Sequence, residues 1–446
     1  MKKHIISLIT VVLFCFACHQ EQVVSVEIDV HLQVKDDRTA PVYVHIENKT
    51  RNAEGYSWTF EGGNPAVSSL RNPDPVRFET PGEHRITLEA WNEGSRETQT
   101  FTVRVDSAVT ADFTVEADVN NYAPAVFKIT NLSSGGTTYR WTFAGGEPSV
   151  YEGQNPPVVR YVEKGSYTII LTVENGSAVF TAQKEIEVRE SMDASFTITP
   201  SFEDEDDLEA PLRATLAAEL MGIESQEWSC PGAEIQNKTQ PVTSIYFPTA
   251  GDYSVTLEVS NGKEKRKITQ TYTVKPNTNL RTHHDIRLGI NTAQETTGSY
   301  YSTRLRKLFK ASEITEENGK DIDIVFFGMN ADFMYNQFVS PDELQATPLK
   351  EIPNASHTHF INLLEDVPFS ITIEQWNAMT TDEILKSLPI TEQIAGNGYF
   401  EKTPLPRIVL FETGDGRKGA ILVKEMVSLS PAESYIVADI KIQKND

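Results

Sequence analysis

The chain has 446 residues and a formal net charge of −23. This length is too great for one ordinary domain and leaves room for three or four. The acidic balance argues against a nucleic-acid-binding protein, because such proteins need basic patches that neutralise phosphates. It also argues against docking on an anionic membrane surface, and it fits an ectodomain that does not adhere to anionic polymers.

The first residues have the pattern of a targeting segment. Lys2 and Lys3 precede an apolar stretch, Ile5 to Ala17, which is short for a membrane span but suits a signal-peptide core. The small residue before Cys18 resembles the cleavage site of bacterial lipoproteins. This resemblance implies a signal peptide over 1–17, a lipid on Cys18, a tether over 18–22 and anchoring in the outer membrane, with an ordinary secretory signal as the alternative. We expect the anchor to face the cell surface; a periplasmic orientation stays open.

Cysteine usage leaves one thiol in the mature chain. Cys15 departs with the signal and Cys18 takes the lipid, so Cys230 is alone and no internal disulfide is expected. Stability must therefore come from the hydrophobic cores, although the compartment would allow disulfides. We expect Cys230 to be a small buried hydrophobe; a reactive thiol is the alternative.

A short aromatic stretch occurs three times. Tyr56–Gly63 returns as Tyr139–Gly146 and, in weaker form, as Gln226–Gly232. A tryptophan, a proline and a glycine keep the same register in all copies: Trp58, Trp141, Trp228; Pro41, Pro124, Pro211; Gly82, Gly165, Gly251. The first two tryptophans are 83 residues apart and the next two 87, so each repeat is long enough to be a domain.

Each copy has the pattern of half-buried strands. Apolar and polar residues alternate in runs such as Tyr167–Val173 and Tyr253–Val259, and turn residues such as Pro81-Gly82 separate the runs. Short strands with such turns predict β-sandwiches, which we place at 23–106, 107–190 and 191–275.

Three motifs carry a resemblance to a known family. Trp58-Thr59-Phe60, then Pro81 to Leu88, then Phe101 to Val105 together resemble a PKD domain, an immunoglobulin-like module. The likeness weakens in the third copy, where Cys230 replaces the phenylalanine. PKD domains are mostly spacers or adhesive modules of extracellular proteins. The short junctions between the copies predict a semi-rigid string of domains that acts as a stalk.

The repeated tryptophans are expected in the sandwich cores, where immunoglobulin-like folds bury a tryptophan. Sugar-stacking platforms are the alternative. Trp91 differs, because strand alternation points Ala90 inward and Trp91 outward.

The third copy contains a run of five acids within Phe202–Asp207. Calcium would suit such oxygen ligands, but the run lacks the spacing and the turn glycine of a calcium loop. We therefore expect a solvated loop.

A different pattern follows a polar linker, Pro276–Thr282. Residues 276–446 have strand signals at Asp285–Ile290, Ile322–Phe327, Pro406–Glu412, Ala420–Val427 and Tyr435–Gln443, a hairpin turn at Asp415-Gly416 and helical signals within Thr372–Leu388. The predicted fold class is all-β and multidomain: three tandem immunoglobulin-like (PKD) β-sandwiches, then a β-rich C-terminal domain with a few helices.

This last part also resembles a known group. Gly298–Ser302, Asp321–Phe326, Gly416–Lys424 and Asp439–Lys444 together resemble the terminal domain of surface lipoproteins of gut Bacteroidetes, many of them encoded with polysaccharide-uptake systems. The resemblance implies a surface glycan-binding protein whose partners are a polysaccharide or oligosaccharide and an outer-membrane transporter complex.

Signals for catalysis are weak. The sequence contains no nucleophile elbow, phosphate loop or zinc-protease helix. His283-His284-Asp285 and His357-Thr358-His359 lack a suitably spaced further ligand. We predict no catalytic residue, no metal and no cofactor; a glycan-active enzyme becomes the better reading if two carboxylates converge in a cleft of the last domain.

A glycan site needs aromatic rings for the apolar faces of sugars and polar groups for the hydroxyls. The candidates are Tyr300, Tyr301, Arg304, Phe333, Tyr335, Trp376 and Tyr399. Core packing is the alternative for each ring, above all for Trp376 in the helical stretch. We therefore predict a non-catalytic lipoprotein that binds a polysaccharide through its C-terminal domain; an adhesin that uses the repeats for protein contacts is the alternative.

Overall fold

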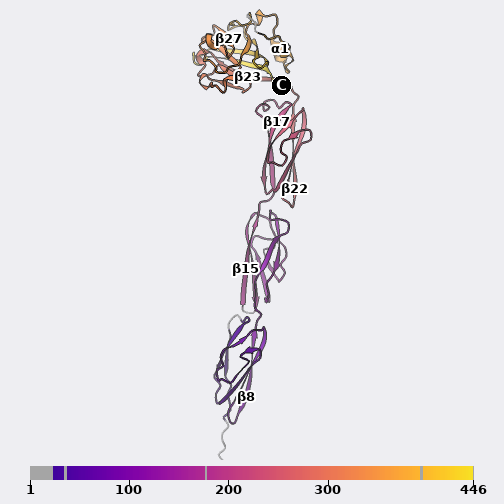
Figure 1. The fold of residues 1–446 in the computed structure, drawn as a ribbon, viewed down its shortest axis with the longest axis vertical. Helices are drawn as coiled ribbons and strands as arrows, with labels where there is room; N and C mark the ends of the chain where they lie inside the picture. The colour runs from indigo at the N-terminus through magenta and orange to yellow at the C-terminus, as the bar shows by residue number, and fades with distance from the viewer. Residues whose placement is uncertain (1–23, 35–37, 176–177, 392–394, 445–446) are drawn as a thin grey trace, which may run out of the picture. The chain divides into compact units, whose positions relative to one another are not determined.

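A computed structural model describes residues 24–34, 38–175, 178–391 and 395–444. The expected signal peptide and Cys18 lie outside the described residues. The described chain forms three successive immunoglobulin-like β-sandwiches and a β-rich terminal domain with a few short helices (Figure 1), which confirms the predicted fold class. No described helix is long and apolar enough to cross a membrane.

Each sandwich consists of two sheets. The first sandwich has the strand orders β1-β2-β6-β4 and β5-β3-β7-β8: β1 (Val30–Val34), β2 (Val42–Asn48), β3 (Gly55–Phe60), β4 (Gly63–Asn64), β5 (Val67–Ser68), β6 (Val76–Phe78), β7 (Gly82–Trp91), β8 (Arg96–Val105). The second has β13-β10-β9 and β12-β11-β14-β15: β9 (Phe113–Ala117), β10 (Ala125–Asn131), β11 (Thr138–Phe143), β12 (Val150–Glu152), β13 (Val159–Tyr161), β14 (Gly165–Asn175), β15 (Ala178–Val188). The third has β16-β17-β20-β19 and β18-β21-β22: β16 (Asp193–Pro200), β17 (Leu212–Met221), β18 (Ser225–Ser229), β19 (Glu234–Ile235), β20 (Val242–Phe247), β21 (Gly251–Ser260), β22 (Lys265–Val274).

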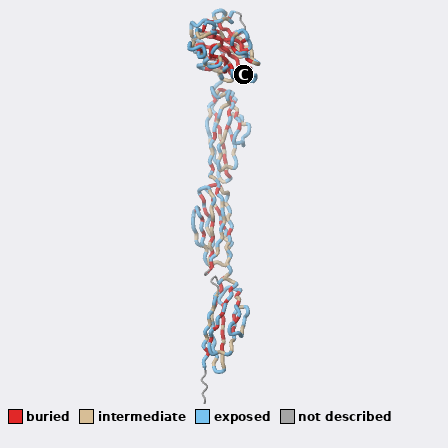
Figure 2. The backbone as a smooth tube through the Cα atoms, turned by 90° about the vertical axis from the view of Figure 1, so that its left-hand side faces the viewer, coloured by how far each residue is buried: buried red, intermediate tan, exposed pale blue. Residues whose placement is uncertain are grey.

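The alternation read from the sequence produces these sandwiches. In β2 every second residue from Val42 to Asn48 is buried and the residues between are exposed, so one face of the strand packs on the core. Figure 2 shows the same distribution along the strands of each sandwich. The three repeated tryptophans are at most 1% exposed, which confirms their core role.

Each buried indole is fixed in the same way. The Nε1–H of Trp58 donates to the carbonyl oxygen of Leu70 at 3.0 Å, that of Trp141 to Gly153 at 3.0 Å and that of Trp228 to Gln240 at 2.8 Å. In every copy the acceptor lies twelve residues further along. A buried indole needs such a partner, so the repeat preserves both the ring and its acceptor.

The repeated glycines open the long hairpins. Gly82, Gly165 and Gly251 begin β7, β14 and β21 with φ of 133°, 157° and 152°, values that side chains disfavour and glycine tolerates. Cys230, which replaces the phenylalanine of the other copies, is buried and free; burial raises the pKa of its thiol. The burial of Cys230 confirms the prediction that it is a small buried hydrophobe.

The terminal domain contains two antiparallel sheets that pack face to face. The larger sheet has the order β23-β31-β30-β29-β28: β23 (Leu280–Gly289), β28 (Thr358–Ile361), β29 (Arg407–Thr413), β30 (Lys418–Val427), β31 (Tyr435–Gln443). The smaller has β25-β24-β26-β27: β24 (Tyr300–Ser302), β25 (Lys307–Phe309), β26 (Ile324–Gly328), β27 (Asn336–Val339). One core cluster joins residues of both sheets, among them Phe326, Phe338, Phe411 and Ile440.

Both sheets are also covered on their outer faces. Trp376 and Leu385 of two short helices, α1 (Ile373–Ala378) and α2 (Glu383–Ser387), pack with Leu410 of the larger sheet. Irregular segments cover the smaller sheet, where Leu349 packs with Val325. Burial on both faces explains the continuous apolar runs of β26 and β29. The remaining helical elements are single 3₁₀ turns: η1 (Asn291–Ala293), η2 (Ala311–Glu313), η3 (Gly319–Asp321), η4 (Leu344–Ala346), η5 (Leu364–Asp366).

Two sequence expectations need correction here. The helical signal over Thr372–Leu388 forms two short helices, because Met379 closes α1 with extended backbone. The expected linker Pro276–Thr282 is shorter than predicted, because β23 begins at Leu280 and pairs with β31.

Packing divides the described chain into two compact units. The first contains the first and second sandwiches, with the start of β16 up to Phe196 and with Ala218–Glu227 and Leu257–Ile268 of the third. The second contains the rest of the third sandwich, from Thr197, and the terminal domain. The acidic run Phe202–Asp207, called the acidic loop below, therefore belongs to the same unit as the terminal domain.

Candidate functional site

Four of the predicted aromatic candidates lie in the core of the terminal domain. Tyr300, Tyr301, Phe333 and Trp376 are at most 3% exposed. The two tyrosines are adjacent on β24 and enter different core clusters on its two faces. Their polar ends are engaged: Tyr300 Oη donates to Gln294 Oε1 at 2.7 Å, and Tyr301 Oη lies 3.0 Å from His283 Nδ1. These rings are structural, because none offers a face to a sugar.

The other two aromatic candidates meet at the surface. Tyr335 is 44% exposed and Tyr399 is 52% exposed. Their ring centroids lie 5.4 Å apart with the planes at 70°, an edge-to-face contact that aromatic pairs favour. This tyrosine pair joins two positions far apart in the sequence, one before β27 and one after the helices.

Backbone pairing sets the geometry of the tyrosine pair. Asn336 and Phe400 form an isolated antiparallel bridge, with Phe400 N–H donating to Asn336 O at 2.8 Å. Asn336 Nδ2 returns a bond to Phe400 O at 3.0 Å. Both bridge residues are at most 1% exposed. Because successive side chains of extended backbone alternate in direction, the residue before each points outward.

The tyrosine pair has apolar neighbours. Phe327 lies 6.4 Å from Tyr399, centroid to centroid, and is 7% exposed, so it supports the pair from below. Met329 and Met334 are 49% and 54% exposed. Among the described residues no hydrogen bond engages either phenol of the pair, so both hydroxyls remain for a ligand. The patch can therefore offer ring faces, flexible apolar side chains and two hydroxyl groups.

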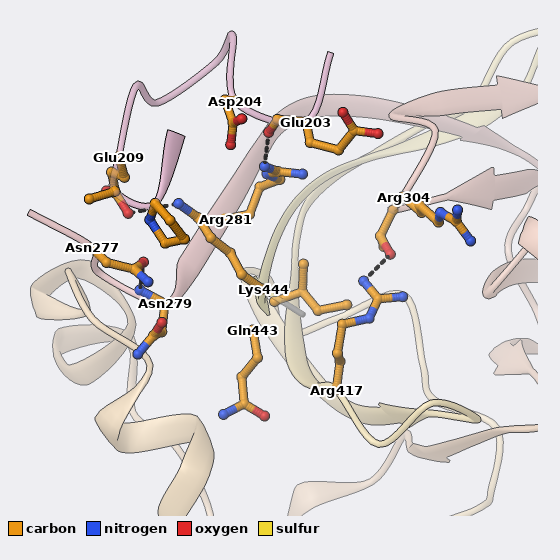
Figure 3. A pocket seen from close by; sticks show the side chains of 14 residues that line it. Glu203, Asp204, Glu209, Asn277, Asn279, Arg281, Arg304, Arg417, Gln443 and Lys444 are labelled. Atoms are coloured by element: carbon orange, nitrogen blue, oxygen red, sulfur yellow. Dashed lines mark hydrogen bonds and ion pairs between the residues drawn. The ribbon is translucent and has the colours of Figure 1, made fainter. Parts of the chain in front are cut away.

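Arg304, the remaining candidate, borders a cavity of about 620 Å³ (Figure 3). Its side chain is 69% exposed, and its nearest charged partner is Asp321 at 3.6 Å. The third sandwich contributes Glu203, Asp204 and Glu209 to the lining, and the terminal domain contributes Arg281, Arg417 and Lys444. We call this hollow the junction cleft. It is separate from the tyrosine pair in its lining residues.

The acidic loop is largely exposed, as expected, and cations of the terminal domain also bind it. Arg306, 11% exposed, bonds Asp206 and Phe202 O, lies 3.1 Å from Glu205 Oε1 and stacks 3.7 Å from the Phe202 ring centroid. Lys444 Nζ lies 2.7 Å from both Asp207 and Glu209. Sequence reasoning missed this pairing because Arg306 and Lys444 are 100 or more residues away from the acids.

A second hollow of about 290 Å³ shares Arg304 and Arg417 with the junction cleft and is lined by Asp321, Asp323 and Asp415. Burial raises the pKa of Asp323 to about 6. Burial acts in the same direction on Asp415, but the Thr413 hydroxyl and the Arg417 charge outweigh it and lower the pKa of that carboxyl. Carboxylates thus do converge here, as the enzyme alternative requires.

The hydrogen bonds and ion pairs of these carboxylates indicate a structural role. Thr303 N–H donates to Asp323 Oδ1 at 2.9 Å, and Oδ2 accepts from the Thr303 hydroxyl and from Arg417 Nη2 at 3.3 Å. Arg417 Nε also donates to Asp415 at 3.0 Å. One guanidinium therefore ties both acids together, and the Asp323 side chain is only 9% exposed. A general acid would need a freer oxygen to reach a substrate.

The contacts of His357 do not have the geometry of a hydrolytic triad. Ser340 Oγ and the carboxylate of Asp342 both contact Nδ1 of His357, at 3.2 and 2.9 Å. A hydrolytic triad needs them on opposite ring nitrogens. His283 is buried against Tyr301, and no described group of three or more His, Cys, Asp or Glu side chains is arranged to hold a metal ion.

Trp91 is half-buried on the first sandwich while Ala90 is fully buried, as alternation predicted. Its ring lies across Gly55, where a Cβ would fall 2.3 Å from Trp91 Cε2, and the guanidinium of Arg96 sits 5.0 Å from its centroid. Both contacts reduce the ring surface left for a partner.

Comparison with known families identifies part of the chain. The sequence model of the PKD domain matches residues 27–105 and 112–188, within the first and second sandwiches. The chain contains two PKD domains. No curated protein matches the sequence.

Several solved structures are similar to this PKD-containing chain at low identity. A DUF4466 family protein from Parabacteroides merdae is 12% identical, with 76% of this chain and 100% of that chain covered and a TM-score of 0.27. Invasin, a bacterial integrin-binding protein, is 11% identical over 93% of this chain and 79% of that chain, with a TM-score of 0.29. The I67–I69 fragment of titin is 11% identical over 56% and 98%, with a TM-score of 0.32.

Proposed function

We propose that this protein is a non-catalytic, lipid-anchored surface protein that binds a polysaccharide through its terminal domain. The exposed tyrosine pair is the observation that carries the proposal. The PKD domains and the third sandwich act as a spacer between the anchor and the binding domain. A bound chain would then pass to a transporter or degrading partner in the outer membrane.

Tyr335 and Tyr399 are exposed although most rings of the domain are buried, so a packing role does not account for them. Their faces can cover the apolar C–H surface of a sugar ring, and their hydroxyls can donate to and accept from sugar hydroxyls. Phe327 and the Asn336–Phe400 bridge hold the two rings in place, which lowers the entropy lost on binding.

A non-catalytic role is supported by the state of the polar groups. The carboxylates of the second hollow are tied to Arg417, and the His357 contacts do not match a hydrolytic triad. These arrangements give local stability without a group poised for proton transfer.

The test is electrophoresis of the purified full chain in native gels cast with plant, microbial and host polysaccharides. The double variant Tyr335→Ala/Tyr399→Ala is compared with Tyr43→Ala, which removes a tyrosine of the first sandwich with 46% exposure. We expect at least one polysaccharide to retard the wild type and Tyr43→Ala, and the double variant to bind about tenfold more weakly or worse. Equal retardation of all three proteins would contradict the assignment of the site.

An adhesin that binds protein through its first PKD domain is the second candidate, and the part of the Trp91 ring that stays exposed is the observation that favours it. The measurement is binding of the chain to immobilised matrix proteins with Trp91→Ala as the variant. Loss of protein binding in that variant, with no retardation by any polysaccharide, would give this candidate the lead.

A further inference from the structure

The junction cleft is built from two parts of the chain. The acidic loop and Glu209 of the third sandwich form one wall, and the terminal domain forms the other (Figure 3). Its volume of about 620 Å³ lies within the range of about 300–1,000 Å³ that ligand pockets occupy, and such pockets occur preferentially where domains meet.

The walls are held in a fixed relation. Glu209 accepts from Thr278 N–H at 2.7 Å, from the Thr278 hydroxyl at 2.9 Å and from Lys444 at 2.7 Å. Arg281 bonds the carbonyl oxygen of Glu203, and Arg306 anchors the far end of the acidic loop. A pocket whose walls are already ordered loses little entropy when a ligand enters.

The charges of the cleft select against an anionic ligand. Lys444 is paired with Asp207 and Glu209, and Arg417 with Asp323 and Asp415. Arg281 also faces Asp207, at 3.6 Å. These cations are therefore already neutralised, and an anionic sugar would meet the carboxylates that neutralise them.

The groups that remain suit hydroxyls. Arg304 is largely exposed and donates only, the exposed Glu203 carboxylate accepts only, and the Asn279 amide can do both. Ala210, Pro211 and Ile442 add apolar lining. Donors, acceptors and a small apolar surface are what a neutral sugar ring needs, since it presents hydroxyls around C–H faces.

We propose that the junction cleft is a second carbohydrate subsite, which takes a short segment of a neutral glycan and needs the third sandwich for one of its walls. The inference rests on the proposed function. In this proposal the third sandwich contributes to glycan binding in addition to its role as a spacer.

Calorimetric titration of the purified full chain with cellohexaose, xylohexaose, mannohexaose and maltohexaose tests the proposal. Arg304→Ala and Glu203→Gln alter the cleft; the glutamine keeps the backbone carbonyl that Arg281 binds. Tyr335→Ala/Tyr399→Ala removes the tyrosine pair. Arg160→Ala is the control, because Arg160 of the second sandwich is 48% exposed and 3.5 Å from Glu147, much as Arg304 is from Asp321.

We expect the wild type and the control to bind two equivalents of one hexasaccharide. Arg304→Ala should weaken one equivalent at least tenfold and Glu203→Gln severalfold, and the double tyrosine variant should remove the other. One equivalent, abolished by the tyrosine changes and unaffected at Arg304, would overturn the second subsite and leave the proposed function standing. One equivalent lost only at Arg304 would support the cleft and displace the tyrosine pair. Absence of binding to all four sugars would overturn both.

Discussion

Replacing Arg306 by alanine is expected to release the acidic loop from the terminal domain. Arg306 occupies the turn between β24 and β25 with a φ of 53°. Its guanidinium joins Asp206, Glu205 and the Phe202 carbonyl, and it lies 3.7 Å from the centroid of the Phe202 ring. The side chain is 11% exposed, whereas both acids are 50% exposed.

These exposures limit the free energy that the contacts of Arg306 contribute. Each ion pair has a half-exposed acid, so solvent screening limits it to about 0.5 kcal/mol. The cation over the ring contributes about 1 kcal/mol in this largely buried position. The acids can return to water after the substitution, so no large penalty for a stranded charge is added. The expected loss is therefore about 2 kcal/mol for the contact between loop and domain.

Hydrogen–deuterium exchange resolves this loss locally, which matters because a chain of several domains does not unfold in one step. The amides of Leu208 and Lys275 are bonded at 2.9 and 2.8 Å beside the loop. A loss of about 2 kcal/mol should speed their exchange about 30-fold. High salt should reduce the difference between the proteins, since it screens the ion-pair part.

Arg407→Ala is the matched control. Arg407 is also 11% exposed, pairs with Glu365 at 3.3 Å and lies 5.3 Å from the Phe400 ring centroid, but it does not contact the acidic loop. It should leave the exchange of Leu208 and Lys275 unchanged. Equal exchange in wild type, Arg306→Ala and Arg407→Ala would refute the reasoning, because the loop would then not depend on this guanidinium.

Three further outcomes are expected. Trp141→Ala should destabilise the second sandwich by about 3–5 kcal/mol, because it removes a fully buried indole and its bond to Gly153; exchange of peptides from that sandwich measures the loss, and Trp91→Ala, which removes a half-buried ring, should cost less in the first sandwich. Burial, with Arg281 adding to it, lowers the pKa of His283 to about 4, so its stabilising contribution is full above pH 6.5 and is lost as the pH falls toward 4. Exchange of terminal-domain peptides should therefore show the wild type, relative to His283→Gln, about 2 kcal/mol less stable at pH 5 than at pH 7. A stability difference between the two proteins that is the same at both pH values would contradict this. Burial raises the pKa of Asp323 to about 6, so the unfolded chain loses the carboxyl proton at a lower pH than the folded chain does. The contribution of Asp323 to the free energy of unfolding should therefore fall as the pH rises from 4 to 6. Titration of the carboxyl group by NMR measures this pKa, and a midpoint near 4 would refute the expectation.

The burial of the aromatic candidates differs from what regular strand alternation predicts. Tyr300 and Tyr301 are adjacent and both buried, because both faces of β24 are covered. Tyr335 and Phe333 are two positions apart and differ completely in exposure, because Phe333 adopts a φ of 55° and the alternation of a regular strand does not extend through it. Sequence patterns alone give no sign of either circumstance.

The repeats could be read from the sequence because their information is local. Alternation fixes which face of a strand is buried, and the register of Trp58, Trp141 and Trp228 with the repeated prolines and glycines fixes the copies. The fold class, the core tryptophans and the buried Cys230 followed from these patterns. The strands of the terminal domain were partly visible for the same reason, since β26 and β29 are continuous apolar runs.

The tertiary structure alone decided which polar and aromatic groups meet. The bridge between Asn336 and Phe400 brings Tyr335 to Tyr399. The acidic loop pairs with Arg306 and Lys444, which lie 100 or more residues further along the chain. Such contacts depend on the closure of long loops and on the packing of whole sheets. No local pattern predicts them, because the sequence around each residue would be equally consistent with a fold that lacked the contact.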